Sequence, residues 1–433
     1  MPLELDLRVP DAGSALSEFL VRRRARAEDV RDAVRAIIDA VIREGDRALC
    51  ELTARLDGFS SDPAELMVPP AALAGACADI DPELRHALEF AAERIRAFHE
   101  GQRPRDRSHT DAAGVRLGER WTAIEAVGLY VPGGQASYPS SVLMNAIPAR
   151  VAGVGRLVMV VPAPGGRVPA PVLAAAALAG VDAVYRIGGA QAIAALAYGT
   201  ATIPTVDKIV GPGNAYVAEA KRQVYGQVGI DSIAGPSEIL IVADGQNDSR
   251  AIAADLLAQA EHDRDAQAIL VTDDAAFAQD VKAAVARQLG QLGRSAIAAA
   301  SWDAHGAVIL VEDLARDAPP LVDRLAPEHL ELAVAEPDAL LARIRHAGAI
   351  FLGRHTPEAV GDYVAGPSHV LPTGGGARFS GGLSVLDFMK RTTLIGCSAA
   401  ALEAIGPAAI RLAEAEGLDG HARSVALRLD GAR

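Results

Sequence analysis

A carboxylate and an imidazole stand side by side in the segment Ala326-Pro327-Glu328-His329-Leu330. The proline disfavours helix for the residue before it, so a turn here can direct both side chains into one cavity. Glutamate and histidine are the side chains most readily tuned toward neutral pH for proton transfer. We interpret Glu328 and His329 as a candidate acid–base pair, with a chance pairing on a surface turn as the alternative.

A second candidate site lies on the helix predicted for Asp255–His262. Gln259 and His262 are three residues apart, which places them on one helix face about one turn apart, whereas Glu261 points elsewhere. Side chains so placed can share a metal, although Gln-x-x-His is not the usual His/carboxylate zinc pair. A capped, solvated helix end explains the same residues equally simply.

Two further stretches carry polar side chains on predicted loops. Thr356–His369 is irregular, contains Glu358 and Asp362, and precedes the glycines of Gly374–Gly376; loops of this kind on an α/β scaffold tend to carry function. Near the C-terminus, Glu416 and His421 flank Gly417, a residue suited to end one helix before another begins. That stretch alone is too short to support an assignment.

Two strands are followed by glycine and then by a predicted helix, at Ile187–Gln191 and Val210–Asn214, and Gly128–Gly134 is a third glycine-bearing strand exit. Bare backbone amides at such turns can hold phosphate, and the helix dipole favours its negative charge. None of the three is the G-x-G-x-x-G dinucleotide fingerprint, so a tight turn without a ligand is the alternative. Tyr130 adds a flat face and a hydroxyl, which serve packing as often as cofactor contact.

Strands and helices alternate along the middle of the chain, which predicts parallel sheets covered by helices. The predicted strands are Leu157–Val161, Ala183–Ile187, Lys208–Val210, Ile239–Val242, Ile269–Thr272 and Val308–Val311. The predicted helices between them include Ser141–Val151, Ala215–Val224, Arg250–His262 and Ala276–Leu289. The first hundred residues and the last thirty or so are expected to be mainly helical.

Bulk properties narrow the class of protein. A chain of 433 residues, half of them apolar, exceeds the usual limit of one core, so two or more domains are expected. A net charge of −13 without clustered Lys and Arg argues against a nucleic-acid partner. The three cysteines form neither a disulfide framework nor a thiolate metal motif, the start of the chain does not read as a signal peptide, and no apolar run approaches a membrane span. We expect a cytoplasmic protein that does not enter a membrane.

Taken together, these segments resemble the histidinol dehydrogenase family over nearly the whole chain, in order and in spacing. The segments that carry the resemblance are GLYVPGG (128–134), GGAQAIAALAYGT (188–200), DKIVGPGNAYVAEAKRQV (207–224), AGPSEIL (234–240), LLAQAEH (256–262), APEHLEL (326–332), TPEAVGDYVAGPSHVLPT (356–373) and ARFSGGLSVLDFMKR (377–391). Two small residues depart from the family pattern: Ser368 stands where Asn is expected, and Gly381 where Ser is commoner. Both departures concern the fine positioning of the site rather than its chemistry.

The resemblance implies roles for individual residues. His329 takes the hydroxyl proton in each oxidation, and Glu328 activates the water that attacks an aldehyde. The implied zinc ligands, one ion per subunit, are Gln259, His262, Asp362 and His421. The implied substrate contacts are Ser237, Gln259, His262, His329, Glu358, Asp362, His369, Glu416 and His421. The implied NAD contacts are Tyr130, Gln191 and Asn214.

The resemblance also implies an α/β fold of two incomplete Rossmann-like parallel-sheet domains with small helical segments at both ends. The expected division is residues 1–25 as an N-terminal helical segment, 26–128 with 238–380 as the first domain, 129–237 as the second, and 381–433 as a helical tail exchanged in a homodimer. The expected activity is the NAD-dependent oxidation of L-histidinol, through L-histidinaldehyde, to L-histidine at the end of histidine biosynthesis. A relative acting on another small diol or amino alcohol is one alternative, and a zinc hydrolase that uses Glu328 as its base is another.

Overall fold

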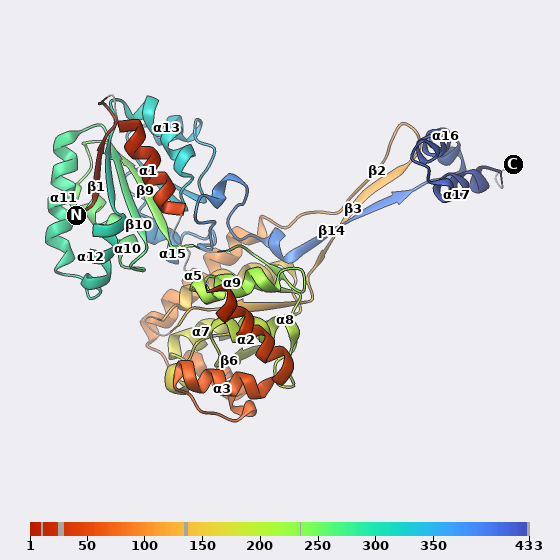
Figure 1. Cartoon of the computed structure of the whole chain (residues 1–433), viewed down its shortest axis with the longest axis horizontal. Coiled ribbons are helices and arrows are strands. Elements are labelled where there is room, and N and C mark those ends of the chain that lie inside the picture. Colours follow the sequence, from red (N-terminus) through yellow and green to blue (C-terminus); the bar gives the residue numbers. More distant parts are fainter. Residues whose placement is uncertain (10–11, 25–29, 134–136, 234, 431–433) are drawn as a thin grey trace.

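The computed structural model describes residues 1–9, 12–24, 30–133, 137–233 and 235–430. The chain forms two lobes, each built on a parallel sheet, and a thin antiparallel arm that carries the C-terminal helices (Figure 1). The motif residues Gly134 and Ala234 lie outside the described residues. Among the described helices, none is long and apolar enough to cross a membrane.

The first lobe contains a six-stranded sheet in the order β1-β11-β10-β9-β12-β13, with every pair parallel. Alternate residues of each strand enter different cores, as the period of a strand requires: Ile239 and Ile241 pack under α10, α11 and α12, whereas Leu240 and Val242 face α13 and α14. The strands are β1 (Leu3–Asp6), β9 (Glu238–Ala243), β10 (Gln267–Thr272), β11 (Ala307–Leu310), β12 (His329–Ala333) and β13 (Ala349–Leu352). The helices are α1 (Ala12–Arg24), α10 (Ser249–Ala260), α11 (Ala275–Leu289), α12 (Ser295–His305), α13 (Leu314–Leu325), α14 (Pro337–Leu341) and α15 (Glu358–Tyr363).

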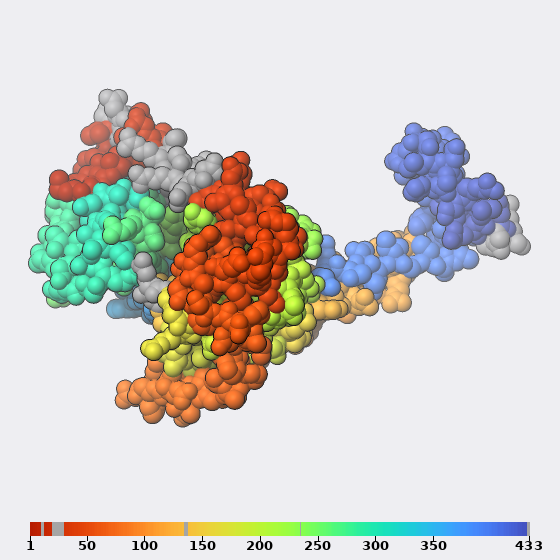
Figure 2. Space-filling view, turned by 60° about the horizontal axis from the view of Figure 1, so that its bottom comes forward, coloured from red at the N-terminus to blue at the C-terminus, as the bar shows by residue number. Residues whose placement is uncertain are grey.

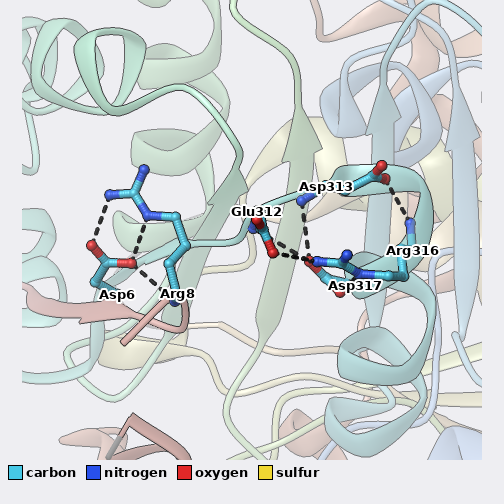
Figure 3. A network of polar contacts seen from close by, with 6 residues as sticks. All are labelled: Asp6, Arg8, Glu312, Asp313, Arg316 and Asp317. Atoms are coloured by element: carbon cyan, nitrogen blue, oxygen red, sulfur yellow. Dashed lines mark hydrogen bonds and ion pairs between the residues drawn. The ribbon is translucent and has the colours of Figure 1, made fainter. Parts of the chain in front are cut away.

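A surface network of charges lies beyond the carboxyl ends of β1 and β11 (Figure 3). Arg8 donates to both carboxylate oxygens of Asp6 at 2.7 Å, and this contact lowers the pKa of Asp6 to about 2. On the other side, Arg316 in the first turn of α13 bonds Glu312 and Asp317. Exposed ion pairs of this kind contribute little to the stability of a fold, so we interpret the network as a solvated surface and not as a ligand site.

The second lobe contains a five-stranded parallel sheet in the order β6-β5-β4-β7-β8. Leu157 and Met159 of its strand β5 face the helices α5, α6 and α7, whereas Val158 and Val160 face α2, α3, α8 and α9. The strands are β4 (Ala126–Tyr130), β5 (Arg156–Val160), β6 (Ala183–Tyr185), β7 (Lys208–Val210) and β8 (Gly229–Ile230). The helices are α2 (Arg31–Glu44), α3 (Asp46–Asp57), α4 (Pro70–Gly75), α5 (Pro82–Glu100), α6 (Pro139–Ala152), α7 (Ala170–Leu178), α8 (Gly189–Tyr198) and α9 (Ala215–Val224), with short 3-10 turns at Pro63–Leu66, Ala76–Ala78 and Pro164–Gly166.

The arm is an antiparallel sheet in the order β14-β3-β2, in which β14 (Met389–Gly396) pairs along its length with β3 (Arg116–Ala123), and β2 (Arg107–Thr110) flanks β3. It carries α16 (Ala399–Ala415) and α17 (Asp419–Asp430), which pack on each other clear of both lobes, as the space-filling view also shows (Figure 2). Two 3-10 turns, Gly376–Arg378 and Val385–Phe388, precede the arm. On this tail the apolar side chains of Leu412 and Leu427 are 65% and 60% exposed.

The α/β prediction with two parallel sheets is confirmed, but the grouping of segments differs from the predicted boundaries. Residues 1–25 contribute the edge strand β1 as well as a helix, and α2, α3 and α5 cover the five-stranded sheet and not the six-stranded one. The apolar stripe of an amphipathic helix shows which face is buried but not which sheet buries it. The arm strands were not predicted, because β3 and β14 are half-exposed and polar rather than apolar runs.

Candidate functional site

Strands β9 and β12 lie side by side in the six-stranded sheet, with His329 in register with Ile239. This pairing places both polar groups of the Glu238 main chain against the predicted acid–base pair. The N–H of Glu238 donates to Oε2 of Glu328 at 2.9 Å, and its carbonyl lies 3.0 Å from Nδ1 of His329. Both side chains are buried, with exposed fractions of 6% for Glu328 and 4% for His329.

The contact with the Glu238 carbonyl defines the tautomer of His329. A carbonyl only accepts, so Nδ1 carries the ring hydrogen and Nε2 holds the free lone pair. Nε2 is buried and has no hydrogen-bond partner. The geometry therefore presents a neutral imidazole with its basic nitrogen open to a ligand.

Burial has opposite effects on the two members of the pair. It lowers the pKa of His329 to about 4, against the opposing charge of Asp362, so the imidazole is neutral near pH 7. It raises the pKa of Glu328 well above its ordinary range, although the hydrogen bond from the Glu238 N–H acts in the other direction. A raised pKa makes the Glu328 carboxylate a stronger base than an ordinary glutamate, which suits the activation of water.

Three more carboxyl groups extend from this pair: buried Glu358 contacts His329, buried Glu331 contacts Glu358, and half-buried Asp255 acts on both. Oε1 of Glu358, the first residue of α15, is 3.4 Å from Nδ1 of His329, and the Glu358 N–H donates to Glu331 at 2.6 Å. Burial, with the charge of Asp255 added, raises the pKa of Glu331 to about 8; burial also raises the pKa of Asp255 to about 6. Protons are therefore held among these carboxyl groups near neutral pH.

The predicted metal ligands of the first lobe meet beside this cluster. Nε2 of His262 lies 4.0 Å from Oδ2 of Asp362, and Nδ1 of His369 lies 3.6 Å from Oδ1. Burial alone would raise the pKa of Asp362, but the hydrogen bond from His369 and the surrounding imidazoles bring it below its ordinary value. Ligand atoms of His329, Glu358 and Asp362 also lie within 4.8 Å of one another.

The side chain of Gln259 supplies a test of whether these residues suit a cation. It is fully buried, and neither its amide oxygen nor its amide nitrogen has a hydrogen-bond partner. An amide left in that state is costly, whereas coordination of its oxygen to a metal would satisfy it. Together with ionised Asp362 and neutral His262, the donors suit a divalent metal that accepts nitrogen and oxygen ligands.

The loop that carries His369 joins the two lobes. Ser141 of α6 lies 3.3 Å from Nε2 of His369, and the hydroxyl of Ser368 donates to the Met144 carbonyl at 3.2 Å. Ser368 also accepts from the Val370 N–H at 3.2 Å. The departure from Asn at this position thus leaves a small side chain that still ties the loop to the second lobe.

All three predicted cofactor residues, Tyr130, Gln191 and Asn214, line one cavity of about 960 Å³ in the second lobe. It opens at the carboxyl ends of β4 and β7, where the strand order of the sheet reverses, and α2 and α3 form its outer wall. This reversal is the place where α/β sheets bind nucleotides. The amide oxygen of buried Gln191 has no partner there, and Asn214 caps α9 by accepting from the Val217 N–H at 3.2 Å.

Two turns at the floor of this cavity depend on glycine. Gly189 begins α8, and its N–H donates to the Tyr130 hydroxyl at 3.1 Å. Gly211 has φ of +111°, and a Cβ there would lie 2.1 Å from the Tyr130 carbonyl. Buried Lys221 donates to the Gly211 carbonyl at 3.0 Å and pairs with Asp231, which accepts from the Gly211 N–H at 2.7 Å. The turn is therefore rigidly held where a phosphate would approach the main chain.

Glu416 and His421 are not brought to the cluster within one chain. Both are exposed on the C-terminal helices, at the far end of the arm from both lobes (Figure 1). Ser237, in contrast, directly precedes Glu238 and is half-buried.

Sequence reasoning missed several residues of the site. Glu238, Glu331 and Asp255 were not identified, and neither was the contact from Ser141. A usable signal was present for two of them, because a carboxylate inside an apolar strand buried on both faces is rare unless it has a partner. Ser141 carries no such signal, since only the fold brings α6 to the His369 loop.

A dinucleotide-sized cavity at the switch point of one parallel sheet, joined through the His369 loop to a buried acid–base pair on another, is the arrangement of a dinucleotide-dependent oxidoreductase. The family model for histidinol dehydrogenase matches residues 20–429. The chain belongs to the histidinol dehydrogenase family, a family of NAD-dependent oxidoreductases.

Individual relatives agree over their full lengths. The histidinol dehydrogenase of Rhodospirillum rubrum is 64% identical over 430 residues, covering 99% of both chains, and that of Rhizobium meliloti is 61% identical over 412 residues, covering 95% of both. The crystal structure of histidinol dehydrogenase from Elizabethkingia anophelis superposes with a TM-score of 0.93 at 35% identity, covering 100% of this chain and 98% of that one.

The lowered pKa of His329 gives a direct prediction. Because burial disfavours the charged imidazole, the ring should stay neutral as the pH falls through 6.5 and should take up a proton only near pH 4. Nitrogen NMR of the metal-free protein labelled in histidine should show the hydrogen on Nδ1 throughout that range, with His329→Asn used to assign the signal. A His329 titration near pH 6.5 would contradict the buried, neutral state.

Proposed function

We propose that this protein oxidises L-histidinol to L-histidine through L-histidinaldehyde, with two molecules of NAD reduced in turn, as the last steps of histidine biosynthesis. The family membership supports the substrate, and the open Nε2 of His329 carries the proposal structurally. An alcohol oxidation needs a base at the hydroxyl and a hydride acceptor at the adjoining carbon. A neutral imidazole with a fixed tautomer meets the first need.

In this proposal His329 accepts the hydroxyl proton in both oxidations, and Glu328 activates the water that hydrates the aldehyde between them. Glu328 is held at one oxygen by the Glu238 N–H, which leaves the other oxygen for water. The carboxyl group of Glu358 lies 3.4 Å from Nδ1 of His329 and helps to hold the ring in place. The buried position of the pair also protects a reactive amino aldehyde from side reactions.

Gln259, His262 and Asp362, with His421 as the fourth ligand, would hold one zinc ion per subunit. The orphaned amide of Gln259 and the 4.0 Å approach of His262 to Asp362 support this set. A bound zinc ion would supply Lewis acidity and would orient the amine and ring nitrogens of the substrate. Ser237, Glu358, His369 and Glu416 complete the proposed substrate contacts, and Tyr130, Gln191 and Asn214 the proposed NAD contacts.

The tail supports a homodimer in which α16 and α17 serve the partner. Within one chain the helices that carry Glu416 and His421 lie away from both lobes, and therefore away from Asp362 (Figure 2). Exposed Leu412 and Leu427 indicate that the tail packs against something in solution. Two-fold symmetry then lets each tail complete the other subunit's site.

The central test is the stoichiometry of nicotinamide reduction. With L-histidinol and NAD, absorbance should report two NADH formed for each histidinol consumed. Chelation should abolish the reaction and zinc should restore it. No NADH in the presence of zinc would refute the proposed activity, and full activity of the metal-free protein would refute the ligand set alone.

The roles of Glu328 and His329 can be separated by measuring the two oxidation steps individually. Glu328→Gln should slow the second oxidation far more than the first, since only the second needs activated water, and His329→Asn should slow both by about 10²- to 10⁴-fold. Histidinol and histidinaldehyde are used as separate substrates. Equal losses for Glu328→Gln in the two assays would mean that the roles are wrongly divided.

Exchange of the tails predicts complementation between inactive mutants. His262→Ala disables the site on its own lobe, whereas His421→Ala disables the site on the partner. Co-expression should return about a quarter of wild-type activity under random pairing, because each mixed dimer has one intact site. Mixed dimers purified through two different tags, and still inactive, would show instead that each tail serves its own chain.

A further inference from the structure

Asp57, the last residue of α3, is a carboxylate whose position the fold does not explain. Gly58 ends the helix in the left-handed conformation, so Asp57 lies at the negative end of the helix dipole. An anion is unfavourable there, because the last carbonyls already carry partial negative charge. Something other than the stability of α3 therefore accounts for an acidic side chain at this place.

No contact among the described residues neutralises the charge of Asp57, although Arg55 of the same helix turn also lines the cavity. Its Oδ2 atom is buried without a hydrogen-bond partner, and burial raises the pKa of the carboxyl group. Within the described part of the chain, no cation is paired with it. Oδ2 is thus a strong acceptor that lacks a donor.

Asp57 lines the same cavity as Tyr130, Gln191 and Asn214. The other carboxylates of that wall already have a cationic partner: Glu44 lies 2.6 Å from Arg47, and Glu51 lies 3.3 Å from the same side chain. Among these acids Asp57 is the one whose buried oxygen is left for a ligand. Its charge also reaches Tyr130, whose pKa burial raises to about 12 with Asp57 adding to the effect.

The two sides of the cavity have complementary polarity. The positive ends of the dipoles of α8 and α9 lie at this side of the cavity, beside Gly189 and Gly213, and favour an anion. The C-terminus of α3, with Asp57, favours hydrogen-bond donors. A dinucleotide offers both features, since its pyrophosphate is anionic and its ribose hydroxyls are neutral donors.

We propose that Asp57 accepts hydrogen bonds from the ribose hydroxyls of NAD and so makes the cavity selective for NAD over NADP. The 2′-phosphate of NADP replaces a donor with a dianion next to an uncompensated carboxylate, so repulsion and a lost hydrogen bond act together. The inference rests on the proposed occupation of this cavity by NAD, and it adds the residue that discriminates between the two dinucleotides.

The test uses Asp57→Asn and Asp57→Ala in the full-length protein, with NADH and NADPH as probes in the absence of substrate. Calorimetric titration should show the dissociation constant for NADH raised by about ten- to a hundredfold, which corresponds to the loss of a hydrogen bond to a charged group. The preference for NADH over NADPH should fall by at least a similar factor. Asp39→Asn is the matched control: it removes the same charge from an exposed position on α2 that does not line the cavity, and it should change neither constant.

Thermal denaturation of the ligand-free variants separates this role from a structural one. Since Asp57 opposes the dipole of α3 and has no partner, both variants should melt at the wild-type temperature or above it. Weaker NADH binding without a loss of melting temperature supports the proposal. A lower melting temperature in both variants assigns Asp57 a structural role and overturns it.

Two further outcomes distinguish this inference from the assignment of the cavity. If wild-type protein binds NADH but Asp57→Asn binds it equally well and with the same preference over NADPH, the role of Asp57 fails and the cavity assignment stands. If wild-type protein does not bind NADH at all, the cavity assignment fails and this inference fails with it.

Discussion

The main chain of Glu238 orients both members of the acid–base pair, and it reaches them because β9 and β12 are neighbours in a parallel sheet. Main-chain groups at a strand end cannot rotate away, so they fix the tautomer of His329 and one oxygen of Glu328 without relying on another mobile side chain. The surrounding apolar layers then remove water, which explains why the two pKa values move in opposite directions. Much of the chain serves this arrangement, since a strand inside a six-stranded sheet requires both of its covering helical layers.

The two lobes contribute opposite ends of their sheets. The proposed acid–base pair lies at the amino ends of β9 and β12, whereas the cavity proposed for NAD lies at the carboxyl ends of β4 and β7. The second location follows the general rule for α/β sheets, and the first departs from it. Burying several carboxyl groups together is costly, because burial and like charge both disfavour the ionised forms, and both effects raise the pKa values of Glu331 and Glu358.

The sequence was sufficient for the central strands and for finding several polar residues that the fold brings together in the first lobe, and the reasons are local. Lys208–Val210 and Ala215–Val224 were predicted with the bounds that β7 and α9 have, because an apolar β-branched run, a glycine turn and an Asn cap follow one another there. The contact between Ser141 and His369 joins segments that are far apart in the chain, and so does the packing of α2 and α3 on the second sheet. The periodicity of a sequence does not predict contacts of this kind. The position of His421 shows the same limit, since helical spacing predicts the helices of the tail but not their position relative to the lobes.

The contact between the two lobes, which the His369 loop makes with α6, has a consequence for the rate of the proposed reaction. If, as proposed, NAD binds at one parallel sheet and the substrate at the other, the distance that the hydride crosses is set by how the lobes meet and not by either binding site alone. The hydroxyls of Ser141 and Ser368 are short, direct links between the lobes. A longer side chain at either position would act as a spacer that moves the two proposed sites apart and lengthens the path of the hydride between them.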